Sequence, residues 1–212
     1  MGIRRITPGV LEFDPSYQED DTEGDQVKIH LSRIPPHTRA THRFLKWQEG
    51  VGVADAFNAA MAFTRGEIQP PLLLLYGKPG LGKSHLSISI GWAYLLTGRS
   101  VVYYQAEELL DALRRGYKVW QAKEPREYSP DSYDSILNYV KAVSLFILDD
   151  LGAQKETEWA VAKLDEIVDY RYRQSLPMVI TANTLDVPER ILDRMKEGRV
   201  VRLRGDSFRG RK

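Results

Sequence analysis

The chain has 212 residues, of which 42% are hydrophobic and 28% charged, with a formal net charge of +1 and no cysteine. This length suits one packed domain with a short extension, and the ordinary composition argues against a disordered, collagenous or membrane-spanning protein. The first ten residues lack the apolar core of a secretory signal, and without cysteine no disulfide framework can form. We therefore expect a cytoplasmic protein without a membrane partner.

Charge is distributed unevenly between the two ends of the chain. The stretch from Glu12 to Asp25 is acidic and contains no Lys or Arg, whereas the stretch from Arg190 onward is rich in both. A basic tail can contact a phosphate backbone, although such runs more often form a solvated face. The acidic start, interrupted by prolines, predicts a polar N-terminal arm over residues 1–45 with a possible strand at 27–31, followed by one folded domain over residues 46–212.

Hydrophobic patterning predicts the elements of the folded domain. In chain order they are helix 51–65, strand 72–76, helix 83–96, strand 101–104, helix 106–115, an irregular stretch 116–130, helix 133–142, strand 145–148, helix 157–172, strand 178–182, helix 187–195 and strand 200–203. The strands are short, unbroken apolar runs, which are typical of a parallel sheet buried on both faces. The sequence therefore predicts a three-layer α/β domain with a largely parallel central sheet and ligands at the carboxyl ends of its strands.

A glycine-rich loop, GKPGLGKS, joins strand 72–76 to the next helix and fulfils the pattern G-x-x-x-x-G-K-[ST]. Its glycines allow backbone N–H groups to point at phosphate oxygens, and the helix N-terminus adds a positive dipole end. Lys83 is expected to reach the outer phosphates and the Ser84 hydroxyl to bind Mg²⁺. The pattern predicts a P-loop site for ATP or ADP with Mg²⁺, formed by Gly77, Lys78, Pro79, Gly80, Leu81, Gly82, Lys83, Ser84 and His85.

Polar residues follow two other predicted strands. Asp149 and Asp150 follow strand 145–148, and Asn183 follows strand 178–182. We expect Asp149 to hold Mg²⁺ through its water shell and Asp150 to orient the attacking water. Glu is more familiar than Asp at the second position, so hydrolysis is expected to be slow. Asn183 is expected beside the phosphates, where it resembles the sensor 1 residue of AAA+ ATPases.

The runs LFILDDLGAQ, TANT and ERILDRMKEGRVVRLRGDSFR resemble the bacterial helicase loaders DnaC and DnaI and the related IstB transposition ATPases, over roughly residues 50–210. This resemblance implies an AAA+ ATPase domain over residues 46–212 without a C-terminal lid domain. It implies that Arg194 is an arginine finger for ATP bound by a neighbouring copy, so that turnover depends on self-assembly. It also implies that Arg190 lies at a position that the family uses and that Arg209 is a sensor 2-like residue at the nucleotide.

The same resemblance implies an ATP switch that binds the replicative hexameric helicase and helps to place it on single-stranded DNA. An IstB-like helper that acts on a transposase and duplex DNA is the nearest alternative. A small-molecule P-loop kinase would explain the nucleotide motifs without requiring Asn183 and Arg194, and a nucleotide-regulated scaffold without useful turnover is a third alternative. Basic and aromatic side chains suited to single-stranded DNA occur at Arg114, Arg115, Tyr117, Lys118, Trp120, Lys123 and Arg126.

Overall fold

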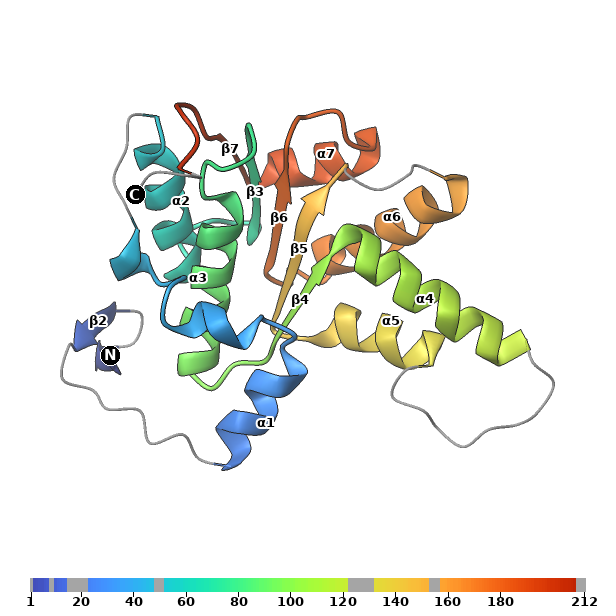
Figure 1. Ribbon diagram of the computed structural model, residues 1–212, viewed down its shortest axis with the longest axis horizontal. Coiled ribbons are helices and arrows are strands. Elements are labelled where there is room, and N and C mark those ends of the chain that lie inside the picture. The colour runs from blue at the N-terminus through green and yellow to red at the C-terminus, as the bar shows by residue number, and fades with distance from the viewer. Residues whose placement is uncertain are drawn as a thin grey trace.

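A parallel sheet lies at the centre of the computed structural model, which describes residues 2–7, 10–14, 23–47, 52–121, 132–152 and 157–208. Within these residues the sheet has five strands in the order β4-β5-β6-β3-β7 (Figure 1). Their bounds are β3 (Leu72–Tyr76), β4 (Val101–Gln105), β5 (Leu145–Leu151), β6 (Met178–Ala182) and β7 (Arg199–Arg202). All neighbouring strands pair in parallel, as the sequence predicts.

Helices cover both faces of this sheet (Figure 1). One face carries α2 (Ala54–Thr64) and α3 (Lys83–Leu96), and the other carries α4 (Ala106–Gln121), α5 (Tyr133–Ala142), α6 (Glu158–Arg173) and α7 (Glu189–Glu197). Alternate strand residues belong to two separate cores, so that Leu73 packs with α2 and α3 whereas Leu72 packs on the α4–α7 side. Burial on both faces explains the unbroken apolar runs. The predicted three-layer α/β fold is confirmed.

The order of the strands determines which residues meet at the carboxyl edge. Strand β6 lies between β3, which leads into the glycine loop, and β5, which contains Asp149 and Asp150. Because the strands are parallel, their carboxyl ends lie at the same edge of the sheet. The loop, the two carboxylates and Asn183 are therefore brought together, with Asn183 between the other two.

The prediction of a strand at 27–31 is wrong, because this segment is the second half of helix α1 (Glu23–Leu31). The helix contacts α3 and β4. Its sequence begins with acidic residues and has Lys28 and His30 in the last turn, a charge order that favours the helix dipole. Before α1, strands β1 (Gly2–Thr7) and β2 (Val10–Asp14) pair antiparallel, which the sequence did not predict.

The segment that follows α1 packs on the domain through two short 3₁₀ helices, η1 (Pro36–Arg39) and η2 (Phe44–Lys46). Ile34 and Phe44 are only 2% and 6% exposed and belong to the core on the α2–α3 side. The indole Nε1 of Trp92 donates to the Thr38 hydroxyl at 3.2 Å. Part of the predicted arm thus contributes to the core, while the division at residue 45 stays a prediction.

Helix α4 continues to Gln121, beyond the predicted end at residue 115. Gly116 lies within the helix and is buried. Its role is close packing, since a side chain there would collide with the backbone of Tyr133. The predicted irregular stretch is therefore wrong for residues 116–121, and residues 122–131 lie outside the described part. Within that described part, the helices are too short or too polar to cross a membrane.

Candidate nucleotide-binding site

The glycine loop connects β3 to α3 and requires two of its glycines for close contacts. A side chain at Gly77 would collide with the carbonyl of Leu203. Gly82 has φ +89°, and a Cβ there would lie 2.6 Å from Cζ3 of Trp47. An L-residue is strained at this φ even without the contact. The loop can therefore lie against Leu203 and Trp47 only with glycine at these positions.

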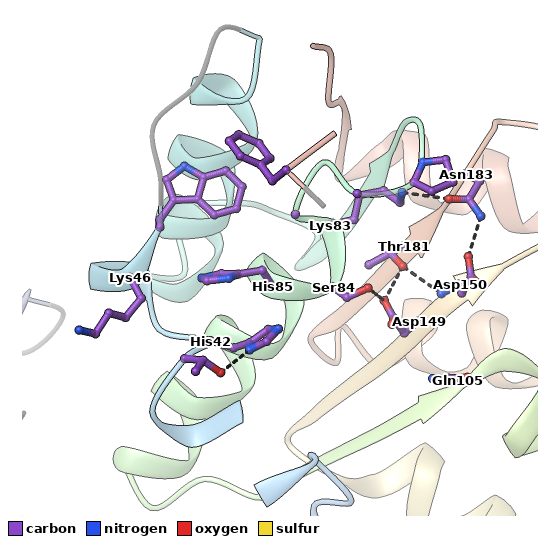
Figure 2. A pocket seen from close by; sticks show the side chains of 16 residues that line it. His42, Lys46, Lys83, Ser84, His85, Gln105, Asp149, Asp150, Thr181 and Asn183 are labelled. Carbon is purple, nitrogen blue, oxygen red and sulfur yellow. Dashed lines mark hydrogen bonds between the residues drawn. The ribbon is translucent and has the colours of Figure 1, made fainter. Parts of the chain in front are cut away.

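Lys83 lies inside the loop with only 7% of its surface exposed. Its ammonium donates to the carbonyls of Gly77 (2.7 Å) and Lys78 (3.0 Å) and to Oδ1 of Asn183 (3.0 Å). Figure 2 shows Lys83 and Asn183 reaching toward each other across the carboxyl edge. The positive charge is thus held inside the glycine loop, where it would attract an anionic ligand together with the N-terminus of α3.

Asp149 is the buried acceptor of the site, 4% exposed at the end of β5. It accepts hydrogen bonds from Ser84 Oγ (3.0 Å), Thr181 Oγ1 (2.6 Å) and the Tyr103 hydroxyl (2.7 Å). Burial and the neighbouring Asp149 raise the pKa of the Tyr103 phenol well above its usual range, so Tyr103 remains a donor. The sequence predicted Ser84 and Asp149 but not their support by Tyr103 and Thr181. Thr181, a hydroxyl within the apolar strand MVITA, was the available signal.

Asp150 has an unusual backbone conformation that directs it toward Asn183. Its φ is +57°, in the left-handed region that Asp tolerates better than most residues, and the pairing of β5 with β6 is irregular here. The Asp150 N–H donates to Thr181 Oγ1 at 2.9 Å instead of extending the ladder. Asn183 Nδ2 donates to Asp150 Oδ1 at 2.8 Å, so one amide connects Asp150 with Lys83.

A cavity of about 700 Å³ opens beside these groups. Its wall includes seven residues that the sequence analysis did not predict: Thr41, His42, Lys46, Trp47, Gln105, Thr181 and Phe208. The predicted residue His85 stacks on His42 at 4.8 Å and meets the edge of Trp47 at 5.4 Å between ring centroids. Burial lowers the pKa of both histidines, which favours their neutral forms. The cavity thus has a polar end at Lys83 and an aromatic end at His42 and His85 (Figure 2), where Trp47 contacts His85.

The remaining loop residues have different positions. Pro79, Gly80 and Gly82 line the cavity, and the N–H of Phe208 donates to the Gly80 carbonyl at 2.9 Å. Leu81 is 1% exposed and packs in the α2–α3 core. Gly77, Lys78 and Leu81 are not among the described residues that line this cavity; they line a neighbouring cavity beside β7. Arg209 lies outside the described residues.

The two arginines of α7 point to acidic residues of α6. Arg194 Nη2 lies 3.0 Å from Asp169 Oδ1, with its guanidinium 5.0 Å from the centre of the Tyr172 ring. The hydrogen bond from Arg194 lowers the pKa of Asp169. Arg190 Nη1 lies 3.0 Å from Asp165 Oδ2. The described part of the cavity wall includes neither arginine, so the structure does not bring Arg194 to the site of its own chain.

Several of the side chains suggested for DNA contact lie on α4. Arg114 pairs with Asp111 at 3.0 Å and lies 5.1 Å over the ring of Trp159, so this arginine has a local structural role. Arg115 and Tyr117 are exposed. The backbone of Lys118 and Trp120 belongs to α4, whereas Lys123 and Arg126 lie outside the described residues. DNA contact by this region stays a prediction.

The sheet order and the residues at its carboxyl edge define an AAA+ type P-loop fold. Solved structures share this fold: AMPPCP-bound DnaA from Aquifex aeolicus matches with a TM-score of 0.68 and 20% identity, over 82% of this chain and 52% of that chain. The crystal structure of the DnaC helicase loader matches with a TM-score of 0.62 and 18% identity, over 80% of this chain and 100% of that chain.

The family model described as IstB-like ATP binding protein matches residues 56–212, so the chain belongs to the family of IstB-like ATP-binding proteins. The replicative helicase loader DnaC of Escherichia coli K12 is 30% identical over 143 residues, which are 64% of this chain and 55% of DnaC. The uncharacterized protein YdaV of the same strain is 34% identical over 142 residues, 63% of this chain and 53% of YdaV. The chain spans about half the length of these curated relatives. The resemblance to this family that the sequence indicated is confirmed.

Proposed function

We propose that this protein binds ATP with Mg²⁺, hydrolyses it slowly, and uses this cycle to place a replicative hexameric helicase on single-stranded DNA. The observation that carries the proposal is the convergence of Lys83, Asp149 and Asn183 at one edge of the sheet, in a chain of the IstB-like ATP-binding family. The relationship to DnaC supports the helicase as the partner.

The triphosphate would bind at the Lys83 end of the cavity and the nucleoside at the Trp47 end. Ser84 Oγ and Asp149 Oδ1 lie 3.0 Å apart, and hydroxyl and carboxylate oxygens are the donors that Mg²⁺ prefers when phosphate oxygens complete its shell. Mg²⁺ bound there would neutralise charge on the transferred phosphoryl group. Tyr103 and Thr181 keep the carboxylate of Asp149 in place by donating to it.

Hydrolysis would use Asp150 and Asn183 from this chain and Arg194 from a neighbouring one. The Asn183 amide orients the Asp150 carboxylate, which would position the attacking water. Arg194 lies outside the cavity of its own chain and keeps 29% of its side chain exposed, which supports a role in trans. An isolated chain would then hydrolyse ATP slowly, and assembly would accelerate it.

An IstB-like role in transposition is the alternative function, favoured by the family match itself. Both functions use the same ATP site, so the nucleotide chemistry cannot distinguish them. The partner does: a loader responds to the helicase and single-stranded DNA, whereas a transposition helper responds to a transposase and duplex DNA.

Phosphate release with and without single-stranded DNA and the cognate helicase tests the proposal. We expect both additions to raise turnover, and a pull-down to recover more helicase with ATP than with ADP. Lys83→Ala is the control, since it removes the buried ammonium and should abolish ATP uptake measured by calorimetry. Turnover that responds only to duplex DNA and a transposase would favour the IstB-like role, and turnover that ignores every addition would contradict both.

A further inference from the structure

A second cavity, of about 720 Å³, lies between the first turns of α6 and α7. We call it the α6–α7 groove. Val161, Ala162 and Pro188 supply its apolar surface. Its charged lining consists of four carboxylates and a single arginine: Glu158, Asp165, Glu166, Glu189 and Arg190. A groove with this lining suits a ligand that has an apolar part next to a positive charge.

Two of these carboxylates are already neutralised. Asp165 pairs with Arg190 at 3.0 Å, and Glu166 pairs with Lys141 at 2.7 Å and Lys163 at 3.0 Å. The side chains of Glu158 and Glu189 have neither an ion pair nor a hydrogen bond with any other described residue. Both lie in the first turn of a helix, where the dipole favours them, but this interaction leaves their outer surface available to a cation.

The complementary surface is η2, on the opposite side of the sheet. Leu45 is 49% exposed there, and the exposed Lys46 follows it directly. In the described part of the chain Lys46 has no acidic partner, and Figure 2 shows its ammonium directed away from Lys83. Residues 26–46 contain no Asp or Glu, and five of them are Lys or Arg. Leu45 and Lys46 thus provide the apolar and cationic pair that the groove suits.

We propose that the α6–α7 groove receives Leu45 and Lys46 of a second copy of this chain, with Lys46 between Glu158 and Glu189. Phe44 of η2 packs in the α2–α3 core, whereas α6 and α7 cover the other face of the sheet (Figure 1). The contact is therefore head to tail and can repeat from copy to copy.

The positions of neighbouring residues fit this contact. Lys46 also lines the wall of the nucleotide cavity, and Arg190 also lines the groove. Docking would bring the first turn of α7 to the mouth of the neighbour's cavity, with Arg194 one turn further along the helix. This consequence rests on the proposed role of Arg194, whereas the complementarity of groove and η2 does not.

The test mixes two assembly-defective variants. Glu158→Lys/Glu189→Lys reverses the groove but keeps η2, and Lys46→Glu reverses η2 but keeps the groove. With saturating ATP and Mg²⁺, we expect each variant alone to need about 10-fold more protein than wild type for half-assembly, measured by sedimentation velocity, because like charges then face each other. An equimolar mixture should assemble close to wild type, since every contact in an alternating assembly is again between opposite charges.

Matched controls separate docking from general charge effects. Asp134→Lys removes an exposed carboxylate from the first turn of α5, so it repeats the loss of helix-dipole stabilisation outside the groove. Lys28→Glu reverses another exposed charge of residues 26–46 outside η2. We expect neither to shift assembly by more than about 2-fold, in keeping with the small worth of exposed charges. Lys46 lines the nucleotide cavity, so saturation is verified for each variant with a fluorescent ATP analogue.

Three results would overturn the proposal. Wild type could remain monomeric with ATP and Mg²⁺, the mixture could assemble no better than its components, or Lys46→Glu could weaken only the binding of single-stranded DNA without altering the mass. The helicase is absent from these measurements, so failure of the loading function would leave them unchanged. Conversely, assembly that follows the charge exchange while the helicase pull-down fails would support the contact and contradict the loader function.

Discussion

The carboxyl edge of the sheet, which we call the phosphate edge after the ligand proposed there, and the surface formed by α6 and α7, which we call the α6–α7 face, hold their charges in opposite ways. At the phosphate edge, Lys83 and Asp149 are 7% and 4% exposed and are fixed by carbonyls and hydroxyls of the loop and strands. On the α6–α7 face, Arg194 and Asp169 keep 29% and 19% of their side chains exposed, and the guanidinium of Arg194 contacts the carboxylate of Asp169. A pair that solvent still reaches contributes little stability, so Arg194 can exchange its partner at low cost. The buried network thus holds its charges in place through hydrogen bonds within the protein.

We expect the largest effect from removing Arg194, on the turnover that assembly stimulates. Arg194→Ala should leave ATP affinity within about 2-fold and change the unfolding free energy by about 1 kcal/mol, because a partly exposed ion pair with Asp169 and a contact with the Tyr172 ring are lost. Assembly-stimulated turnover should fall by about 10³-fold or more if Arg194 acts as a finger in trans. Arg173→Ala is the matched control, since Arg173 pairs with the same Asp169 at 2.8 Å and is 68% exposed. Unchanged stimulated turnover in Arg194→Ala would remove the finger assignment.

The second prediction concerns Arg171, the buried exception on α6. Its guanidinium donates to the carbonyls of Val140 (2.8 Å), Lys141 (3.1 Å), Val143 (3.0 Å) and Pro177 (2.6 Å), and burial lowers its pKa to about 10. It therefore remains charged at neutral pH and joins the end of α5 to the start of β6. Arg171→Ala should lower the unfolding free energy by about 3–5 kcal/mol, measured by denaturant titration, because several buried carbonyls lose their donor. A loss no larger than that of Arg173→Ala would contradict this role.

Arg171 also illustrates why sequence predicts the phosphate edge better than its surroundings. The strands were predictable because both faces are buried, and the loop because its glycines and Lys83 occur at a fixed spacing. The role of Arg171 was not, since an arginine near the end of a helix ordinarily lies in solvent. Trp47 joins the cavity through tertiary packing against Gly82, and helix α1 was missed because its apolar residues are few, with Val27 and Leu31 53% and 51% exposed.

The Thr181 hydroxyl connects two groups of the buried network, and we expect a smaller effect from its removal. Thr181→Val keeps the shape of the side chain but removes the hydroxyl that donates to Asp149 and accepts from the Asp150 N–H. We expect a loss of about 1–3 kcal/mol in unfolding free energy, since two buried groups lose a partner. Weaker binding of ATP with Mg²⁺, measured by calorimetry, should accompany it. Thr184→Val, in the exposed turn after β6, is the control, and equal effects of the two variants would contradict the prediction.

We expect the smallest effect in the pH dependence of stability, where the two regions titrate over different pH ranges. His42 and His85 have lowered pKa values because of burial, so their contribution to stability is present above the ordinary histidine pKa near 6.5 and is lost as the pH falls through the lowered values. Asp169 has a pKa lowered by Arg194, so its contribution is present above the ordinary carboxyl pKa near 4 and is lost below it.

Unfolding free energy measured between pH 7 and pH 3 should therefore fall in two stages. His42→Gln should flatten the upper stage, Asp169→Asn should flatten the lower stage, and His30→Gln, at an exposed histidine of α1, should alter neither. An unchanged upper stage in His42→Gln would contradict the assignment to the cavity wall.

The side-chain amide of Asn183 connects the nucleotide site with the start of the segment that leads to α7. Its oxygen accepts from Lys83 and its nitrogen donates to Asp150. Rotating the amide by half a turn would place its nitrogen, a donor, against the Lys83 ammonium and its oxygen, an acceptor, against the Asp150 carboxylate. A phosphate that drew the Lys83 ammonium outward would leave that oxygen without its donor and remove one restraint on the end of β6. Only residues 183–188 separate that end from α7, so a shift of the strand end would reach the helix that presents Arg190 and Arg194.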